Sequence, residues 1–240
     1  FRLPILSLRM YSATHGESME KNESLVDILV SEKIIKSKTV EKAMKEVNRR
    51  DFVDDPADAY IDSPMRIGYG ATISAPHMHA YALEWLNPYF SPEGRVLDVG
   101  SGSGILCALF NKMMNNTGIV VGIEHIEELT DLGISNLAKS HQEEMDSGKI
   151  TIITGDGRDG YKDHSPYDVI HVGAAAPKIP EALINQLIVG GILMIPVGPE
   201  DGHQSIKLIK KISDKEIEEK DLLGVRYIPL CDKEYQLKYR

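Results

Sequence analysis

Apolar residues in the N-terminal part of the chain recur at intervals of three and four, the period of a helix with one buried face. The pattern predicts one helix that begins at Asn22 and continues to Ile35, a second over Lys38–Val47 and a third over His77–Leu86. Residues 51–70 contain several prolines and glycines and no sustained period, so this stretch is predicted to be irregular.

After Gly94 the pattern changes to short apolar runs that alternate with amphipathic stretches. The predicted strands are Arg95–Val99, Gly118–Ile123, Lys149–Thr154, Tyr167–Val172 and Gly191–Val197. The predicted helices between them are Ile105–Met114, Ile126–Ser140 and Pro180–Leu187. Such alternation is typical of βαβ units in a parallel sheet. Ser205–Ile212 and Val225–Pro229 are predicted to add antiparallel β structure at the end.

These elements predict an α/β protein with a Rossmann-like, mostly parallel, doubly wound sheet. Residues 1–21 are expected to form a flexible N-terminal extension and residues 22–240 a single domain. Within that domain we expect a helical region over 22–93, a ligand-binding core over 94–198 and a β addition over 199–240. The first residues, FRLPILSLRM, have some features of a transit or signal peptide, but an unstructured extension or an expression remnant is the preferred interpretation.

The charge balance disfavours nucleic acid as a partner. The chain carries 36 acidic and 27 basic side chains, a net charge of -9, whereas binding to duplex phosphates requires clustered lysine and arginine. The local basic cluster of Lys207, Lys210 and Lys211 is followed at once by acidic residues, which indicates a solvated surface of mixed charge.

Two further features of composition bear on where the protein works. No apolar run approaches the roughly 18 residues of a membrane helix, so we expect no membrane partner. Cys107 and Cys231 lie far apart in the chain and are expected to be reduced thiols of a cytoplasmic protein.

The segment Asp98–Gly104 carries the main candidate chemistry. A predicted strand ends, three glycines turn the chain and a helix begins, so free amides at the helix N-terminus can meet polar ligand atoms. Nicotinamide and flavin proteins use similar loops, but their spacing is G-x-G-x-x-G, whereas Gly100, Gly102 and Gly104 follow G-x-G-x-G. With Asp98 two positions before the first glycine, the spacing resembles the first motif of S-adenosylmethionine methyltransferases.

Acidic residues follow the next two predicted strands. A carboxylate at Glu124 can accept hydrogen bonds from both hydroxyls of a ribose, and the nearby glycine loop favours this role over that of a surface acid. Asp156, between Gly155 and Gly157, could equally belong to a plain turn, because Asp-Gly is a favoured turn pair. The loop and Glu124 together favour a cofactor contact for Asp156.

Several stretches resemble the protein-L-isoaspartate O-methyltransferase family. They are ATISAPHMHA at 71–80, the glycine loop, GDGR at 155–158, YDVIHVGAAAP at 167–177 and LCDKE at 230–234. The resemblance covers roughly residues 25–236, and the 71–80 stretch is too long and unusual to match by chance. It implies the S-adenosylmethionine methyltransferase fold and methyl esterification of L-isoaspartyl and D-aspartyl residues in damaged proteins. S-adenosyl-L-methionine is the implied cofactor and S-adenosyl-L-homocysteine its product.

The resemblance also implies roles for particular residues. Ser74 is the implied active-site serine, close to the substrate carboxylate, and Ser74 and Ile228 are expected to bind the substrate. The positions at which the family binds the cofactor are Ala71, Thr72, Ile73, Ser74, His79, Asp98, Gly100, Ser101, Gly102, Ser103, Glu124, His125, Asp156, Gly157 and Gln236. Two residues depart from the family pattern: Glu124 stands where aspartate is common, and Cys231 stands where threonine is common.

The chemistry requires little from the protein besides placement. A carboxylate with a pKa of about 4 is ionised at neutral pH, so no general base is needed. We expect Ser74 to hydrogen-bond one carboxylate oxygen, and the segment Val225–Pro229 to pair with an extended substrate as an added strand.

Other roles remain open for some of these side chains. His77 and His79 are two positions apart, which does not place them on one helix face, so no metal site is expected. Ser74 could also cap the helix that begins near Pro76. His171 is expected to have a packing or substrate-rim role rather than that of a general base.

Three rival functions share parts of these motifs. A methyltransferase acting on RNA or a small molecule would not need the 71–80 stretch, and a nicotinamide-dependent oxidoreductase is disfavoured by the glycine spacing. A non-enzymatic S-adenosylmethionine-binding protein would not need Ser74. The expected partners are isoaspartyl proteins and peptides, and the expected state is a monomer.

Overall fold

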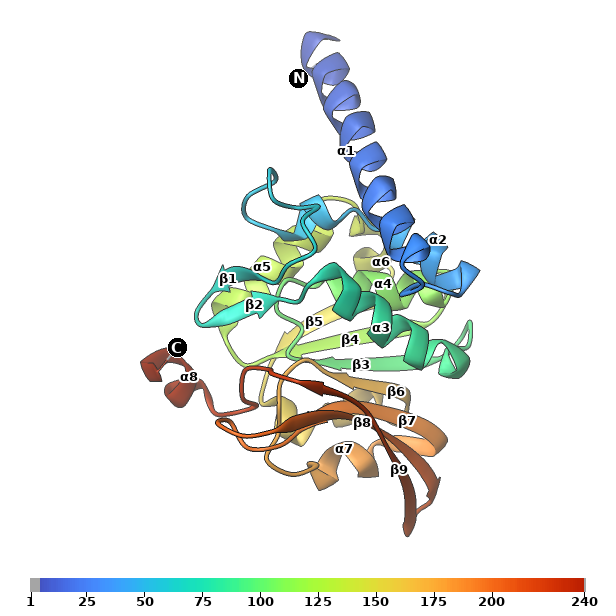
Figure 1. The fold of residues 1–240 in the computed structure, drawn as a ribbon, viewed down its shortest axis with the longest axis vertical. Coiled ribbons are helices and arrows are strands. Elements are labelled where there is room, and N and C mark those ends of the chain that lie inside the picture. The colour runs from blue at the N-terminus through green and yellow to red at the C-terminus, as the bar shows by residue number, and fades with distance from the viewer. Residues whose placement is uncertain (1–4, 240) are drawn as a thin grey trace.

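The computed structural model describes the backbone of residues 5–239 and the side chains of residues 16–238. Its centre is a seven-stranded sheet with the order β5-β4-β3-β6-β7-β8-β9 (Figure 1). The strands are β3 (Arg95–Val99), β4 (Ile119–Glu124), β5 (Ile150–Thr154), β6 (Tyr167–Val172), β7 (Leu187–Val197), β8 (Gln204–Ser213) and β9 (Glu216–Val225). Strands β3 to β7 are parallel, and β8 and β9 are antiparallel. The predicted α/β class and mostly parallel sheet are confirmed.

Helices lie on both faces of this sheet. They are α1 (Ile5–Ser31), α2 (Lys38–Glu46), α3 (Pro76–Leu86), α4 (Ile105–Met113), α5 (Glu127–Ala138), α6 (Gln142–Asp146), α7 (Glu181–Asn185) and α8 (Lys233–Tyr239). None of the helices in the described part of the chain is both long and apolar enough to cross a membrane.

Alternate side chains of the strands belong to two hydrophobic cores. Val96 and Val120 pack with α2 to α5 in the larger core, whereas Leu97 and Val121 pack with Leu183 of α7 in the smaller one. This division follows from the two-residue period of a strand, which points successive side chains to opposite faces. Because both faces are buried, these strands are almost continuously apolar.

The N-terminal helix is longer than its apolar pattern predicts. Instead of beginning at Asn22, α1 begins at Ile5 and extends away from the sheet (Figure 1). Its contacts with the rest of the protein include Ser18, whose hydroxyl lies 2.7 Å from that of Tyr60, and Asn22, which donates to the carbonyl of Met44. The segment expected to be a flexible extension is therefore helical from Ile5 onward, while residues 1–4 lie outside the described residues.

A two-stranded hairpin lies within and just after the stretch predicted to be irregular. Strand β1 (Met65–Gly68) pairs with β2 (Ala71–Ile73) in antiparallel fashion. The strands are too short to give a recognisable alternation of apolar and polar residues. Strand β2 leads directly into Ser74 and α3.

The last strand lies earlier in the chain than predicted. Residues 214–219 are exposed, as expected for a solvated surface, but Glu216–Val225 also form strand β9, and the predicted strand Val225–Pro229 does not continue beyond Val225. Cross-strand ion pairs from Lys207 to Glu219 (3.2 Å) and Asp221 (3.6 Å) accompany the pairing of β8 and β9. An edge strand with charges on its exposed face resists pairing with other chains, but those charges hide it from a search for apolar periodicity.

Candidate active site

The glycine loop joins β3 to α4 and is bound to the neighbouring strand. The amides of Gly100 and Ser101 both donate to the carbonyl of Ile123, at 2.8 and 3.2 Å. Gly102 has a φ of +47°, and a Cβ at this position would lie 3.1 Å from Cδ1 of Ile67. Glycine is therefore required here both for its backbone conformation and for the close approach of the β1–β2 hairpin.

Glu124 ends β4 beside this loop and is only 6% exposed. Its carboxylate accepts hydrogen bonds from the amides of His125 (2.8 Å), Gly102 (3.2 Å) and Ile126 (3.2 Å). Burial raises the pKa of Glu124, and these amides oppose the rise by stabilising the ionised form. The protein thus holds a carboxylate at the carboxyl end of β4, where a parallel sheet binds ligands.

Asp156 belongs to a turn, and it also lines a cavity. Its side chain accepts from the amide of Arg158 and so caps the short 3₁₀ turn Gly157–Asp159. It also pairs with the Arg158 guanidinium at 2.6 Å, which lowers the pKa of the carboxyl group. The same residue lies on the wall of the cavity that contains Glu124, so the turn geometry and a ligand contact are compatible.

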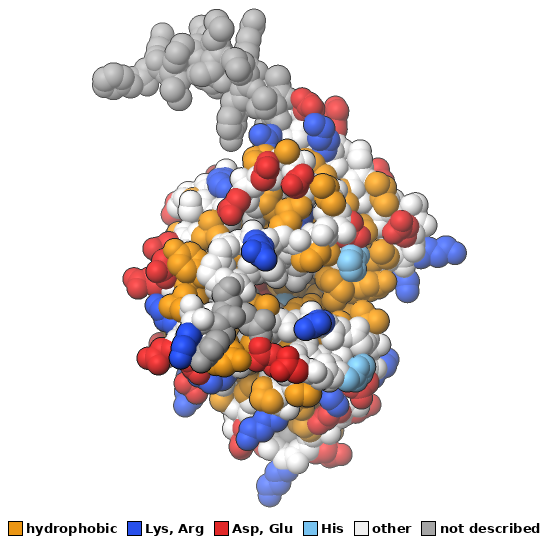
Figure 2. Space-filling view, turned by 60° about the vertical axis from the view of Figure 1, so that its left-hand side comes forward, with side chains coloured by type: hydrophobic (Ala, Val, Ile, Leu, Met, Phe, Trp, Pro, Cys, Tyr) orange, Lys and Arg blue, Asp and Glu red, His pale blue; other side chains and the backbone are white. Residues whose placement is uncertain are grey.

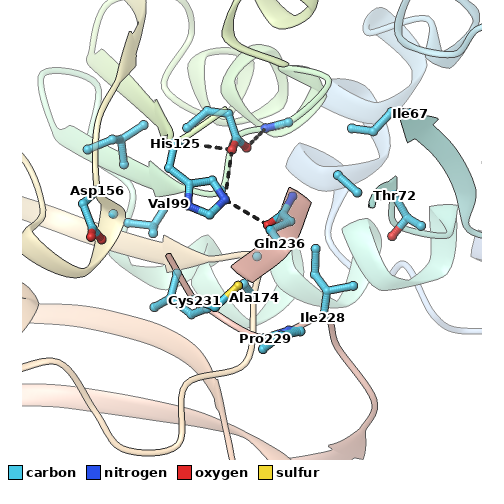
Figure 3. A pocket seen from close by; sticks show the side chains of 18 residues that line it. Ile67, Thr72, Val99, His125, Asp156, Ala174, Ile228, Pro229, Cys231 and Gln236 are labelled. Atoms are coloured by element: carbon cyan, nitrogen blue, oxygen red, sulfur yellow. Dashed lines mark hydrogen bonds and ion pairs between the residues drawn. The ribbon is translucent and has the colours of Figure 1, made fainter. Parts of the chain in front are cut away.

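The C-terminal helix α8 closes one side of this cavity. Gln236 is buried; its Oε1 lies 2.9 Å from Nε2 of His125, and its Nε2 donates to the carbonyl of Tyr69 at 3.0 Å. Figure 3 shows Gln236 facing His125, with Asp156 on one side of the cavity and Thr72 on the other. One glutamine therefore connects the end of the chain to the end of β4 and to the β1–β2 hairpin.

All residues expected at the cofactor line two adjoining cavities. The strand-end cavity lies beside the ends of β4 and β5, and the helix-end cavity lies beside the first turns of α3 and α4. The first is lined by Ala71, Thr72, Gly100, Gly102, Glu124, His125, Asp156, Gly157 and Gln236. The second is lined by Thr72, Ile73, Ser74, His79, Asp98, Gly100, Ser101, Gly102 and Ser103. Thr72, Gly100 and Gly102 belong to both, so the predicted set comes together in space.

Asp98 lines the helix-end cavity, but its carboxylate oxygens bond to the side chains of His171 and Cys107. It is 1% exposed, and its Oδ1 accepts from Nδ1 of His171 at 2.7 Å while Oδ2 accepts from Sγ of Cys107 at 3.5 Å. His171 packs edge-on against Phe110, with ring centroids 5.7 Å apart. His171 thus has a packing role and also lines the helix-end cavity, while its expected role at the substrate rim stays a prediction.

Ser74 lies between the helix-end cavity and an outer groove. The groove is lined by Pro64, Thr72, Ser74, Ala75, His77, Met78, Gly173 and residues 223–228. Ser74 and Tyr227 line both spaces. Burial raises the pKa of Tyr227, and a hydrogen bond with the Ser74 side chain acts in the opposite direction. Ile228, the other expected substrate residue, also lines the groove.

Ser74 does not cap a helix. The N-cap of α3 is Ala75, which has no capping side chain. The amide of His77 is instead satisfied by Oδ1 of Asp62 at 3.0 Å, and the same carboxylate pairs with Nδ1 of His77 at 2.9 Å. The Ser74 hydroxyl is thereby left for another role.

The pairing of residues 225–229 with a substrate strand stays a prediction, and part of the backbone of this segment is bonded within the protein. Val225 is the last residue of β9, and the residues after it belong to no named strand. The amide of Ala175 donates to the carbonyl of Ile228 at 2.8 Å, and the amide of Tyr227 donates to Oε1 of Gln204 at 2.7 Å. Residues 225–228 of this segment line the groove.

Two residues at the site, Tyr227 and Arg49, could not be recognised as site residues from the sequence. Tyr227 is adjacent to Ile228, yet nothing in its local pattern indicates contact with Ser74, about 150 positions away. Arg49 is 3% exposed and donates to the carbonyl of Ser74 at 2.9 Å, but in the sequence it is one of two consecutive arginines in a polar stretch. The side chains within residues 16–238 form no cluster of three or more potential metal ligands.

Comparison with known proteins identifies the family. The family model for protein-L-isoaspartate(D-aspartate) O-methyltransferase matches residues 20–235. The chain is 47% identical over 222 residues to protein-L-isoaspartate O-methyltransferase 1 of Arabidopsis thaliana, covering 92% of this chain and 96% of that protein. It is 46% identical over 215 residues to a Caenorhabditis elegans relative of the same name, covering 90% and 94%.

Solved structures agree with the sequence comparison. A Plasmodium falciparum structure described as a protein-L-isoaspartate O-methyltransferase in complex with S-adenosyl-L-homocysteine superposes with a TM-score of 0.81. It is 32% identical, and the match covers 88% of this chain and 98% of that one. From its sequence, its sheet and the gathering of the expected residues around two cavities, this chain belongs to the protein-L-isoaspartate(D-aspartate) O-methyltransferase family.

Proposed function

We propose that this chain transfers the methyl group of S-adenosyl-L-methionine to the free carboxylate of L-isoaspartyl and D-aspartyl residues in damaged proteins, initiating their repair. The observation that carries the proposal is the place of Ser74, on the wall shared by the helix-end cavity and the outer groove. A serine there can contact a substrate carboxylate in the groove next to a methyl donor bound on the cavity side. The names of the relatives support the same reaction.

The residues of the two cavities fit this cofactor. Among the described side chains, the hydroxyl of Ser101 is buried without a hydrogen-bond partner and lines the helix-end cavity, so a polar ligand would satisfy it. The Glu124 carboxylate is suited to ribose hydroxyls, Asp156 to an adenine amino group, and the polar side chains of Ser101, Ser103 and His79 to the amino-acid end. The bound cofactor supplies an electrophilic methyl group.

The protein's contribution to the reaction is placement. The substrate carboxylate is already ionised at neutral pH, so the Ser74 hydroxyl donates to one of its oxygens and directs the other toward the helix-end cavity. Tyr227 is in hydrogen-bonding contact with Ser74; when the substrate is bound, the Tyr227 hydroxyl can donate to the Ser74 oxygen, which leaves the Ser74 proton for the carboxylate. Correct placement of reacting groups can lower a barrier by roughly 7 to 11 kcal/mol, and exclusion of water from the attacking oxygen adds to this.

Selectivity for isoaspartate follows from covalent geometry. In isoaspartate the backbone continues through the side-chain carbon, so the chain is one methylene longer and the free carboxylate is attached to Cα. A groove that holds the chain on both sides of the residue brings this carboxylate, and not that of normal aspartate, to Ser74. Ile228 and its neighbours line this groove together with the start of α3.

One assay tests the proposal directly. Radiolabelled methyl transfer is measured with an isoaspartyl peptide and with its normal aspartyl twin. We expect base-labile label only on the isoaspartyl peptide; equal labelling of both peptides, or of neither, would overturn the assignment. Labelling of RNA or of a small molecule instead would favour a different methyltransferase, and cofactor binding without any transfer would favour a non-enzymatic role.

The proposal extends to a monomer that acts in the cytoplasm without nucleic acid. The net charge of -9 supports a partner other than nucleic acid, and the free thiols of Cys107 and Cys231 support the cytoplasm. On the face seen in Figure 2, acidic and basic side chains are interspersed. Sedimentation of the purified protein and fractionation of its cells are the corresponding measurements.

A further inference from the structure

Arg49 is a buried guanidinium directly behind the active serine. It begins the 3₁₀ turn Arg49–Phe52 and is 3% exposed. Its Nη2 donates to the carbonyl of Ser74 at 2.9 Å, and its Nη1 lies 3.4 Å from Nδ1 of His79. The nearby acid that acts on it, Asp62, is paired with His77. The geometry of Arg49 is therefore set by the active-site segment and not by a close ion pair with Asp62.

The contact with Arg49 bears on which nitrogen of His79 carries the hydrogen. Burial lowers the pKa of Arg49 to about 10, so the guanidinium is charged at neutral pH and can only donate. His79 is buried, and its burial together with the charge of Arg49 holds its pKa well below the usual value, so the ring is neutral. In a neutral imidazole facing an obligate donor, Nδ1 carries the lone pair and Nε2 carries the hydrogen.

His79 separates Arg49 from the helix-end cavity. Arg49 lines a small cavity behind the site together with Asn22, Met44, Pro76 and His79. His79 also lines the helix-end cavity, as do Ser74 and Ser101, whereas Arg49 does not. Arg49 therefore acts on a ligand in that cavity through two intermediaries, the His79 ring and the Ser74 backbone.

We propose that Arg49 is a positioning residue that fixes the Nε2–H tautomer of His79 and the backbone of Ser74. The helix-end cavity then presents an N–H donor at His79, suited to a carboxylate or other oxygen acceptor of the bound ligand. One buried cation thus couples the side of the site that holds the methyl donor to the serine that receives the substrate. This inference rests on the proposed function only in taking S-adenosylmethionine as the ligand of that cavity.

The decisive measurement is the tautomer of His79. Imidazole ¹⁵N spectra of the full chain report which ring nitrogen carries hydrogen, with His79 assigned by the His79→Gln variant. We expect Nε2–H in the unmodified protein. A protonated Nδ1 would overturn the proposal without any variant.

Variants at Arg49 separate positioning from mere support of the fold. Arg49→Met removes the donors and should give His79 a mixture of tautomers and weaken S-adenosylhomocysteine binding roughly tenfold by calorimetry. Arg49→Lys keeps an obligate donor and should restore the single tautomer and most of the affinity. Arg50→Met, one position along the chain, is the matched control and should change the affinity less than twofold.

The possible results divide clearly. An Arg49→Met protein that melts earlier but keeps the Nε2–H tautomer and normal affinity would show a structural role and overturn the proposal. If Arg49→Met does not fold, the unmodified protein and Arg49→Lys still decide, because loss of the single tautomer in the lysine variant contradicts the donor argument. None of these readouts uses an isoaspartyl substrate, so their failure is distinguishable from failure of the proposed reaction.

Discussion

The two cavities and the outer groove are built in different ways. The cavities are formed largely by short contiguous motifs at the ends of β3, β4, β5 and β6, held by backbone hydrogen bonds within the sheet, and are completed by the hairpin, the start of α3, residues 227–231 and α8. The groove is formed by the start of α3, the loop before β1 and the segment after β9, which are far apart in the sequence. The cavities depend mainly on the order of the strands, and the outer groove depends on the packing of side chains that are remote in the sequence. Substitutions should therefore affect cofactor binding and substrate turnover separately.

The largest effect is expected on the cavity side, from Glu124→Gln. An amide replaces the carboxylate, so the backbone amides of Gly102, His125 and Ile126 lose acceptor capacity and the ligand loses a charged acceptor. Affinity for S-adenosylhomocysteine should fall roughly 100-fold by calorimetry, while the KM for isoaspartyl peptide at saturating cofactor changes little. The exposed Glu127→Gln is the control; equal effects of the two would contradict the role of Glu124.

The pH dependence of cofactor binding also tests the role of the ionised Glu124. Burial raises the pKa of Glu124, so the carboxylate becomes protonated at a higher pH than an ordinary glutamate as the solution is acidified. Because the ionised form is the acceptor, affinity should fall as the pH drops through this raised pKa. The Glu124→Gln variant should lose this component, and an unchanged profile would assign it to another group.

On the groove side, Ser74→Ala should lower kcat for the isoaspartyl peptide roughly 30-fold, through loss of a hydrogen bond to a charged group. Affinity for S-adenosylhomocysteine should stay within about twofold, because the backbone of Ser74 remains held by Arg49. Ser135→Ala, on the exposed face of α5, controls for the substitution itself. Normal turnover of Ser74→Ala would exclude the assigned role.

A smaller effect is expected from Tyr227→Phe. The variant removes the hydroxyl that contacts Ser74 but keeps the ring that lines the groove, so kcat/KM for the peptide should fall about fivefold. Cofactor affinity should not change. Tyr89→Phe, remote from both cavities, serves as the matched variant. A fall in cofactor affinity instead would mean that Tyr227 contributes to cofactor binding as well as to substrate turnover.

The smallest effect concerns Cys231, which lines the strand-end cavity. Cys231→Thr restores the residue common in the family and should tighten S-adenosylhomocysteine binding about threefold by adding a hydroxyl. Cys231→Ala should leave the affinity nearly unchanged. If the alanine variant binds more weakly than the native protein, then the thiol itself contributes and the departure from the family pattern is compensated.

Sequence-based prediction succeeded for the motifs at the strand ends and failed for elements without an apolar pattern. The loop at Gly100–Gly104 and the acids Glu124 and Asp156 were identified because consecutive parallel strands place their carboxyl ends at one edge of the sheet. Strand β9 was missed because an exposed edge strand carries charges where a buried strand carries apolar residues. The early start of α1 was missed because its first turns have no apolar period.

The sequence by itself determined the fold class, the cofactor motifs and the family, because each depends on residues that are close in the chain or on strands that follow in order. Only the tertiary structure decided that Arg49 lies behind Ser74, that Tyr227 contacts it, and that Gln236 connects α8 to His125 and Tyr69. These contacts join residues 25 to 167 positions apart. They depend on how helices, hairpin and chain end pack against the sheet, and local periodicity carries no information about that packing.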